Sequence, residues 1–388
     1  MNKLNLLRIL LVVGVYVLVS GASYKVLSSI AVPGVSSPIS APKIGENGTL
    51  SFDQSLPKTE SCPLNGAKYS KQQRQWWEKH EPLGVVIENH PDARPQSGLS
   101  SADVVYEAVA EGGITRFLAE FYCQDAGIVG PVRSARTYFI DELSELGKYP
   151  LYAHVGGANT PGPANALGQI EDYGWAGYND LSAFSIGCPV YCRDDSRNGK
   201  TVATEHTMYS STPKLWDYAK TKREITNITE DGQWDQDFTP WQFKEDNPSK
   251  AGTQTVHVEF WPSMGSKFFV DWKYDPKAND YKRFIDNSSS IDRNNKKQIA
   301  AKNIVAMYMI ESNANDGYED NVHLLYKNKG KGKAEVFMDG KQIKGTWEKA
   351  SRTDRTIIKD NTGAEVKFNR GQIWLQVVPT QEGVVKVQ

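Results

Sequence analysis

Residues 103–123 read DVVYEAVAEGGITRFLAEFYC, and this stretch decides the fold of the first half of the chain. Apolar and polar residues alternate on both sides of Gly112 and Gly113, a pattern typical of a β-hairpin with a two-residue turn. A helix over 102–110 is the alternative, because the apolar residues there also fit a helical period. Pairing Glu111 with Ile114 predicts two faces. The predicted core face carries Val104, Tyr106, Ala108, Ala110, Thr115, Phe117, Ala119 and Phe121, and the other carries Glu107, Glu111, Arg116 and Glu120, with Arg116 in reach of Glu107 and Glu111.

The segments around the hairpin show both strand and helix patterns. Residues 83–89, LGVVIEN, and the start of 151–167, LYAHVGGANTPGPANAL, predict strands. Residues 135–150 have apolar residues at helical spacing with Gly147 as a stop, and a second helix begins at Thr212 and Pro213. From residue 256 onward, short strands alternate with turns. We therefore expect an α+β protein, with a mixed α/β N-terminal domain followed by a mostly β C-terminal domain.

The length of 388 residues leaves room for two domains and a tail. Stretches rich in Pro, Ser and Gly, or poor in periodicity, suggest the boundaries. We expect a signal-anchor or transmembrane segment at 1–32, a linker at 33–61, the N-terminal domain at 62–224, a second linker at 225–252 and the β-rich domain at 253–388.

The first 25 residues have the pattern of an export segment. Lys3 and Arg8 precede an apolar run from Ile9 to Val19, which ends in small residues. Cleavage near Gly21 to Ser23 is one outcome, and a retained anchor is the one we expect. The basic residues place the short N-terminal side in the cytoplasm. The sequence thus predicts a single-pass protein of the cell membrane whose C-terminal part is extracytoplasmic.

Four cysteines occur in a chain expected to lie in an oxidising compartment. An even number there indicates disulfides, and we expect Cys62 to pair with Cys123 and Cys188 with Cys192, because short loops close most readily. Zinc binding by the CPVYC segment is the alternative, but a single pair of this spacing is poor for zinc. We expect no metal and no cofactor.

Several runs closely resemble the YerB-like lipoproteins of bacteria, a family built on a domain of unknown function. They are GVVIENHPDARPQSGLSSADVVYEAVAEGGITRFLAEF at 84–121, GPVRSART at 130–137, AHVGG at 153–157 and HTMYSS at 206–211, and in the β-rich part DGKQIKGTWEKA at 339–350 and GQIWLQVVP at 371–379. The resemblance implies a membrane-tethered, extracytoplasmic protein of uncharacterised activity. This chain departs from a lipoprotein in having no cysteine before Cys62.

The GPVRSART run places Arg133 and Arg136 where a helix is about to begin, although the positive end of a helix favours carboxylates. Something negative should therefore lie nearby. One interpretation is an anion site, since guanidinium groups and hydroxyls suit phosphate geometry. The alternative is structural pairing with Asp141, Glu142 or the hairpin glutamates. The candidate anion-binding residues are Arg94, Arg116, Arg133, Ser134, Arg136, Thr137, His154 and His206.

Two classes of function stay open. The first is a binding or scaffold module of the cell envelope whose partner is the membrane and an anionic glycan or lipid. The second is an enzyme acting on a phosphate-bearing envelope glycan or lipid, because the order of parts is similar to that of LytR-type phosphotransferases. Forty-five basic against 46 acidic residues give no global attraction to nucleic acid, and we expect none to bind. G-x-S-x-G, H-E-x-x-H and Walker motifs do not occur in the sequence.

Overall fold

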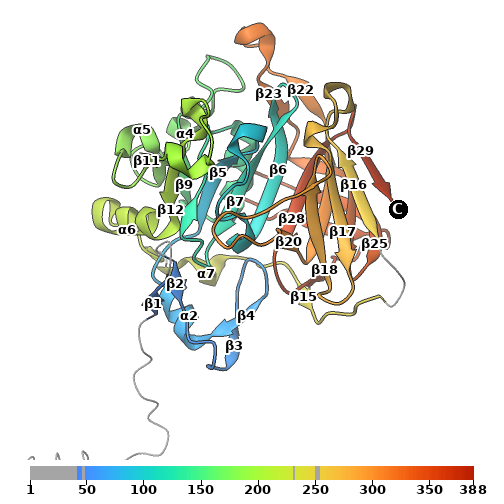
Figure 1. Cartoon of the computed structure of the whole chain (residues 1–388), viewed down its shortest axis with the longest axis horizontal. Helices are drawn as coiled ribbons and strands as arrows, with labels where there is room; N and C mark the ends of the chain where they lie inside the picture. Colours follow the sequence, from blue (N-terminus) through green and yellow to red (C-terminus); the bar gives the residue numbers. More distant parts are fainter. Residues whose placement is uncertain (1–41, 46–48, 230–231, 250–253) are drawn as a thin grey trace, which may run out of the picture. The chain divides into compact units, whose positions relative to one another are not determined.

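The computed structural model describes residues 42–45, 49–229, 232–249 and 254–388 (Figure 1). Pro42–Gln388 forms one compact unit. The predicted anchor at 1–32 lies outside the described residues. Among the residues that are described, no helix is both long and apolar enough to span a bilayer.

A ten-stranded sheet runs through both halves of the chain. Five strands from the N-terminal half are followed by five from the C-terminal half, and the halves meet where β6 pairs in parallel with β28, Val104 lying opposite Ile373 (Figure 1). The order is β10 (Asp180–Ser182), β9 (Leu151–His154), β5 (Leu83–Glu88), β7 (Ile114–Phe121), β6 (Val104–Glu111), β28 (Ile373–Pro379), β21 (Asn303–Met309), β24 (Gly330–Met338), β25 (Lys341–Lys349) and β26 (Ile357–Asp360).

A second, six-stranded sheet belongs to the C-terminal half. It contains β19 (Ser288–Ser289), β18 (Asp280–Ile285), β17 (Val270–Asp275), β16 (Thr255–Glu259) and β29 (Val384–Val387), with β20 (Ala300–Ala301) against β18. A three-stranded sheet joins β11 (Cys192–Arg193), β12 (Met208–Ser211) and β8 (Ile128–Val129). Two-stranded pairs are β1 (Lys43–Ile44) with β2 (Leu50–Ser51), β3 (Lys58–Ser61) with β4 (Lys68–Ser70), β13 (Ile228–Thr229) with β14 (Gly232–Gln233), β15 (Phe243–Lys244) with β27 (Phe368–Asn369), and β22 (Glu311–Asn313) with β23 (Leu324–Tyr326).

The described α-helices all lie before residue 238. They are α2 (Lys71–Trp77), α3 (Thr137–Leu143), α4 (Ala166–Asp172), α5 (Ala183–Ile186), α6 (Thr212–Arg223) and α7 (Trp234–Asp237). The predicted α+β class is therefore confirmed. The helix predicted after residue 135 is α3, which continues as a 3-10 turn to Leu146 and ends at Gly147. The second predicted helix is α6, with Pro213 in its first turn.

The predicted hairpin is present as β6 and β7, and Glu111 lies opposite Ile114 as expected. The predicted faces are wrong, because the register shifts between Val109 and Glu111. A one-residue shift moves every preceding side chain to the other face. Glu107 consequently lies opposite Phe117, while Arg116 lies opposite Ala108. Both faces are buried, so neither is a solvent face.

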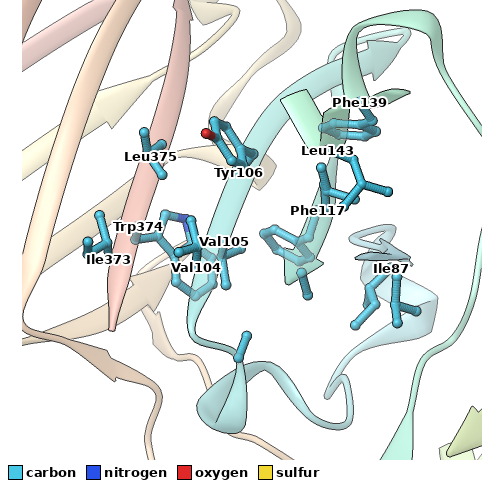
Figure 2. Close-up of a cluster of buried hydrophobic side chains, with 14 of the residues drawn as sticks. Ile87, Val104, Val105, Tyr106, Phe117, Phe139, Leu143, Ile373, Trp374 and Leu375 are labelled. Carbon is cyan, nitrogen blue, oxygen red and sulfur yellow. The ribbon is translucent and has the colours of Figure 1, made fainter. Parts of the chain in front are cut away.

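The hairpin forms the centre of a large hydrophobic core. Figure 2 shows Val104, Val105 and Tyr106 of β6 between the side chains of β28 on one side and those of Phe117, Phe139 and Leu143 on the other. All of the labelled residues are buried, and the ring of Trp374 packs edge-on against Phe117 at 5.5 Å. The same apolar core therefore includes residues from both halves of the chain.

The predicted linkers contain ordered structure among their described residues. Part of 33–61 forms β1, β2 and β3, and the amide of Leu50 donates to Asp125. In 225–252 the indoles of Trp234 and Trp241 are buried, and Trp241 Nε1 donates to the carbonyl of Thr356 at 2.7 Å.

Both expected disulfides are present, Cys62 with Cys123 and Cys188 with Cys192. The first joins the segment before α2 to the end of the hairpin. The second closes a loop of five residues before β12. No cysteine in the described chain is free, and the chain has four.

Candidate functional site

The GPVRSART segment runs across the ends of two strands. Its backbone is pinned to β5, because the amide of Arg133 donates to Val86 and the amide of Glu88 donates to Pro131. It is also pinned to the chain that leaves β9, since the amide of Val155 donates to Arg133. These backbone hydrogen bonds place Arg133 and Arg136 beside the end of β5, where Glu88 lies.

Glu88 and Glu111 each hold a group of ion pairs, and together these form the arginine network with Arg116, Arg133 and Arg136. Glu88 is the centre of the first group. Its Oε1 lies 3.4 Å from Arg133 Nε, and its Oε2 lies 2.9 Å from His206 Nδ1. Glu88 also stands directly opposite Arg116 in the β5–β7 ladder. The carboxylate is almost fully buried, as is the ring of His206. Arg133 and His206, both expected at a site, are thus brought together by Glu88, which is not among the predicted site residues.

Glu111 is the centre of the second group. Its two oxygens contact Arg116, at 2.7 Å from Nη2, and Arg136. This pairing of a hairpin glutamate with an arginine of the helix start is the structural alternative that the sequence left open. Burial lowers the pKa of Arg116, Arg133 and Arg136 from the usual arginine value, although guanidinium groups in proteins stay protonated. The two glutamates offset part of the cost of burying this charge.

The arginine donors exceed the acceptors that the network offers. Nε of Arg116 and Arg136, and Nη1 of Arg116, are buried and have no hydrogen-bond acceptor among the described residues, and Nε of Arg133 has the 3.4 Å ion-pair contact with Glu88. Three guanidinium groups form ion pairs with two carboxylates. Entry from outside is open at Arg133 and Glu111, whose side chains are 26% and 23% exposed.

Three other residues of the predicted anion site, Arg94, Ser134 and Thr137, form no ion pair with Glu88 or Glu111 among the described contacts. Arg94 donates to the carbonyls of Asn89 and Lys267 and lies over the ring of Phe268, so it serves the contact with the C-terminal half. Ser134 and Thr137 lie on either side of Arg136 in the chain and are partly exposed.

His154 is buried with both ring nitrogens engaged. Nδ1 lies 2.6 Å from the carbonyl of Gly156 and Nε2 lies 2.6 Å from Asp180 Oδ1. Because a carbonyl oxygen only accepts, Nδ1 donates to Gly156. His154 lines a separate cavity of about 420 Å³ with Asp180 and the exposed Phe184. It is therefore outside the arginine network.

A second histidine joins the network beyond His206. The rings of His90 and His206 are parallel within 7°, with centroids 4.6 Å apart. His90 begins the 3-10 turn Pro91–Ala93, and His206 ends the 3-10 turn Thr204–His206. Asp92, in the first of these turns, pairs with Lys200 at 2.6 Å. The sequence did give one indication of this cluster, since a charged Glu88 ends an otherwise apolar strand and His90 follows it.

Comparisons with known proteins match nearly the whole described chain. The family "Protein of unknown function (DUF3048) N-terminal domain" matches residues 66–226, and its C-terminal domain matches residues 256–375. The Bacillus subtilis (strain 168) protein named "Putative lipoprotein YerB" is 32% identical over 323 residues, which are 83% of this chain and 87% of that protein. The crystal structure of the YerB protein from Bacillus subtilis is similar with a TM-score of 0.68 and 26% identity, covering 84% of this chain and 100% of that one. The chain therefore belongs to the YerB-like family of proteins with the DUF3048 N- and C-terminal domains.

Proposed function

We propose that the chain is a membrane-tethered, extracytoplasmic binding module that holds an anionic group of a cell-envelope glycan or lipid at the arginine network. The apolar run of residues 9–19 after two basic residues supports the membrane anchor. Two disulfides suit an oxidising compartment. The lipoprotein name of the Bacillus subtilis relative agrees with a position at the outer face of the membrane.

The excess of arginine donors carries the proposal. Three N–H groups on Arg116 and Arg136 lack an acceptor among the described residues, and the three cations of the network pair with Glu88 and Glu111, while Glu205 also interacts with Arg133. A buried donor without an acceptor costs about 1–3 kcal/mol, and more when it is charged. A phosphate or carboxylate oxygen placed among the arginines would accept these hydrogen bonds and balance the remaining charge.

Binding is favoured over catalysis because the acid-base groups of the network are already engaged. Glu88, Glu111 and His206 are each tied into ion pairs, and His154 is held by Asp180 and Gly156. A general acid or base must reach the proton that it transfers. The arrangement therefore suits an anchor for charge better than a phosphotransfer site.

The test is one arginine substitution with a matched control. Arg133→Gln removes the most accessible guanidinium of the network and leaves the Glu111 pairs intact. Charge-assisted hydrogen bonds contribute about 1.5–3 kcal/mol, so affinity for pyrophosphate, measured by calorimetry on the full chain in detergent, should fall about tenfold to a hundredfold. Glycerophosphoglycerol, the soluble headgroup of phosphatidylglycerol, serves as the lipid probe in the same titration, because the anchor would carry the full chain onto vesicles of any composition.

Arg94→Gln is the control, because Arg94 is also partly buried but bonds to backbone carbonyls outside the network. Its affinity should equal that of the unmodified chain. If the unmodified chain binds neither probe, or if Arg133→Gln and Arg94→Gln bind equally, the arginines are structural and the proposal fails.

A further inference from the structure

We propose that His90, Asp92 and His206 form a binding site for one divalent metal ion of the zinc class, next to the arginine network. One ligand atom from each residue lies within 4.8 Å of the others. Two imidazoles and a carboxylate form a donor set that suits Zn²⁺ and leaves at least one coordination position for water or a ligand. The metal site shares Glu88 with the arginine network, but its three ligands are two histidines and an aspartate, and none of them is an arginine.

Glu88 supplies the second observation. Metal-ligating histidines commonly give their other ring nitrogen to a carboxylate, which fixes the tautomer and raises the basicity of the ligand. His206 Nδ1 lies 2.9 Å from Glu88 Oε2, so the ligating atom of His206 would be Nε2. Arg133 holds the other oxygen of the same carboxylate. The buried half of the site is thus already oriented as in a carboxylate–histidine–metal triad.

The exposed half has room to close on an ion. Ligands about 2.0–2.1 Å from a tetrahedral Zn²⁺ lie about 3.4 Å apart, so the three atoms must approach each other. The parallel rings of His90 and His206 must also turn, because ring nitrogens ligate in the plane of the ring. His90 and Asp92 are 32% and 48% exposed and belong to a surface turn, whereas His206 stays fixed by Glu88.

One further feature suits a cation here. Asp92 already attracts one cation, because Lys200 Nζ lies 2.6 Å from its Oδ1. The ammonium group of Lys200 would compete with the ion for this carboxylate.

Calorimetric titration of the metal-stripped full chain in detergent with ZnCl₂ tests the proposal, with Co²⁺ absorption as the spectroscopic measurement of coordination. We expect one ion per chain. His90→Ala and Asp92→Asn should each weaken binding at least tenfold, and Glu88→Gln should weaken it about tenfold to a hundredfold through His206. Lys200→Gln should instead strengthen binding, because it removes the competing cation.

The control is His257→Ala, since His257 also contacts two carboxylates, Asp271 and Glu259, on another part of the surface. It should leave the stoichiometry and affinity unchanged. His90 and Asp92 lie in an exposed turn, and unchanged melting curves of their variants would show that the fold is intact. Absence of stoichiometric binding, loss of binding in His257→Ala, or unchanged affinity in His90→Ala would each overturn the site. The arginine proposal has a separate readout, because His90→Ala should leave pyrophosphate binding in place.

Discussion

Replacing Glu107 should strongly weaken the junction between the two halves of the chain. It is fully buried, and its carboxylate accepts from Arg283 Nη2 at 2.8 and 3.1 Å, from Trp374 and Gln376 at 3.1 Å each, and from Thr115 at 3.0 Å. Arg283 is itself only 1% exposed. Glu107→Gln keeps the shape of the side chain but leaves the guanidinium without its counterion. Breaking a buried pair in this way costs about 3–5 kcal/mol, a large fraction of the stability of a typical domain.

Urea unfolding followed by tryptophan fluorescence measures this cost directly. Glu60→Gln is the control, because Glu60 pairs with the half-exposed Arg74 and such surface pairs contribute about 0–1 kcal/mol. Replacing both partners, with Glu107→Gln and Arg283→Met together, should cost less than the sum of the two single changes, since neither charge is then stranded. A loss below about 1 kcal/mol in Glu107→Gln, or simple additivity in the double variant, would refute the reasoning.

Three other predictions concern pH, disulfides and the membrane. Burial raises the pKa of Glu81 and Glu120 to about 8 each, so the folded state retains protons that the unfolded state has released. The free energy of unfolding should therefore fall by about 1 kcal/mol per group between pH 7 and 8. Glu120→Gln should reduce this pH dependence, and a urea midpoint that rises with pH would contradict the prediction. Removing the Cys62–Cys123 disulfide, whose cysteines are 61 residues apart, should lower the free energy of unfolding by about 4 kcal/mol, and removing Cys188–Cys192 by about 2 kcal/mol, because a longer closed loop restricts the unfolded chain more. Equal losses in urea unfolding of the two double-serine variants would argue against this entropic explanation. The protein should fractionate with membranes, and recovery of a soluble product that starts near Ser23 would show a cleaved segment instead.

The hairpin shows how far local sequence patterns carry. Gly112 and Gly113 both have positive φ, as a two-residue turn between alternating runs requires, and the pairing of Glu111 with Ile114 follows from that turn. The register of β6 on the N-terminal side of Ala110 cannot be predicted from the turn, because it shifts between Val109 and Glu111. It depends on packing on both faces of the sheet, and a bulge that buries Glu107 opposite Phe117 becomes favourable only because Arg283 from the other half of the chain is there to pair with it.

The site shows the same division between local and long-range information. A pair of arginines at a helix start is locally unfavourable, which correctly predicted acidic neighbours, and Glu111 is one of them. His206 and Glu88 are 118 residues apart in the sequence, and no local pattern joins them. Arg94 bonds to the nearby Asn89 and to Lys267, and its contact with Lys267, 173 residues away, is also beyond the reach of any local pattern.

Two of the buried ionic clusters among the described residues differ in ways that distinguish a structural role from a binding role. At Glu107 one carboxylate pairs with one guanidinium, that of Arg283, whose Nε has no acceptor among the described residues. The rings of Phe117, Trp272 and Trp374 surround this guanidinium, with their centroids 5.2–5.8 Å from its carbon. No anion can enter there. At Glu88 and Glu111 three guanidinium groups meet two carboxylates, and Arg133 opens the cluster to the surface. A site for an external anion requires an excess of positive charge that solvent can reach. A structural junction requires equal and opposite charges that are closed to solvent.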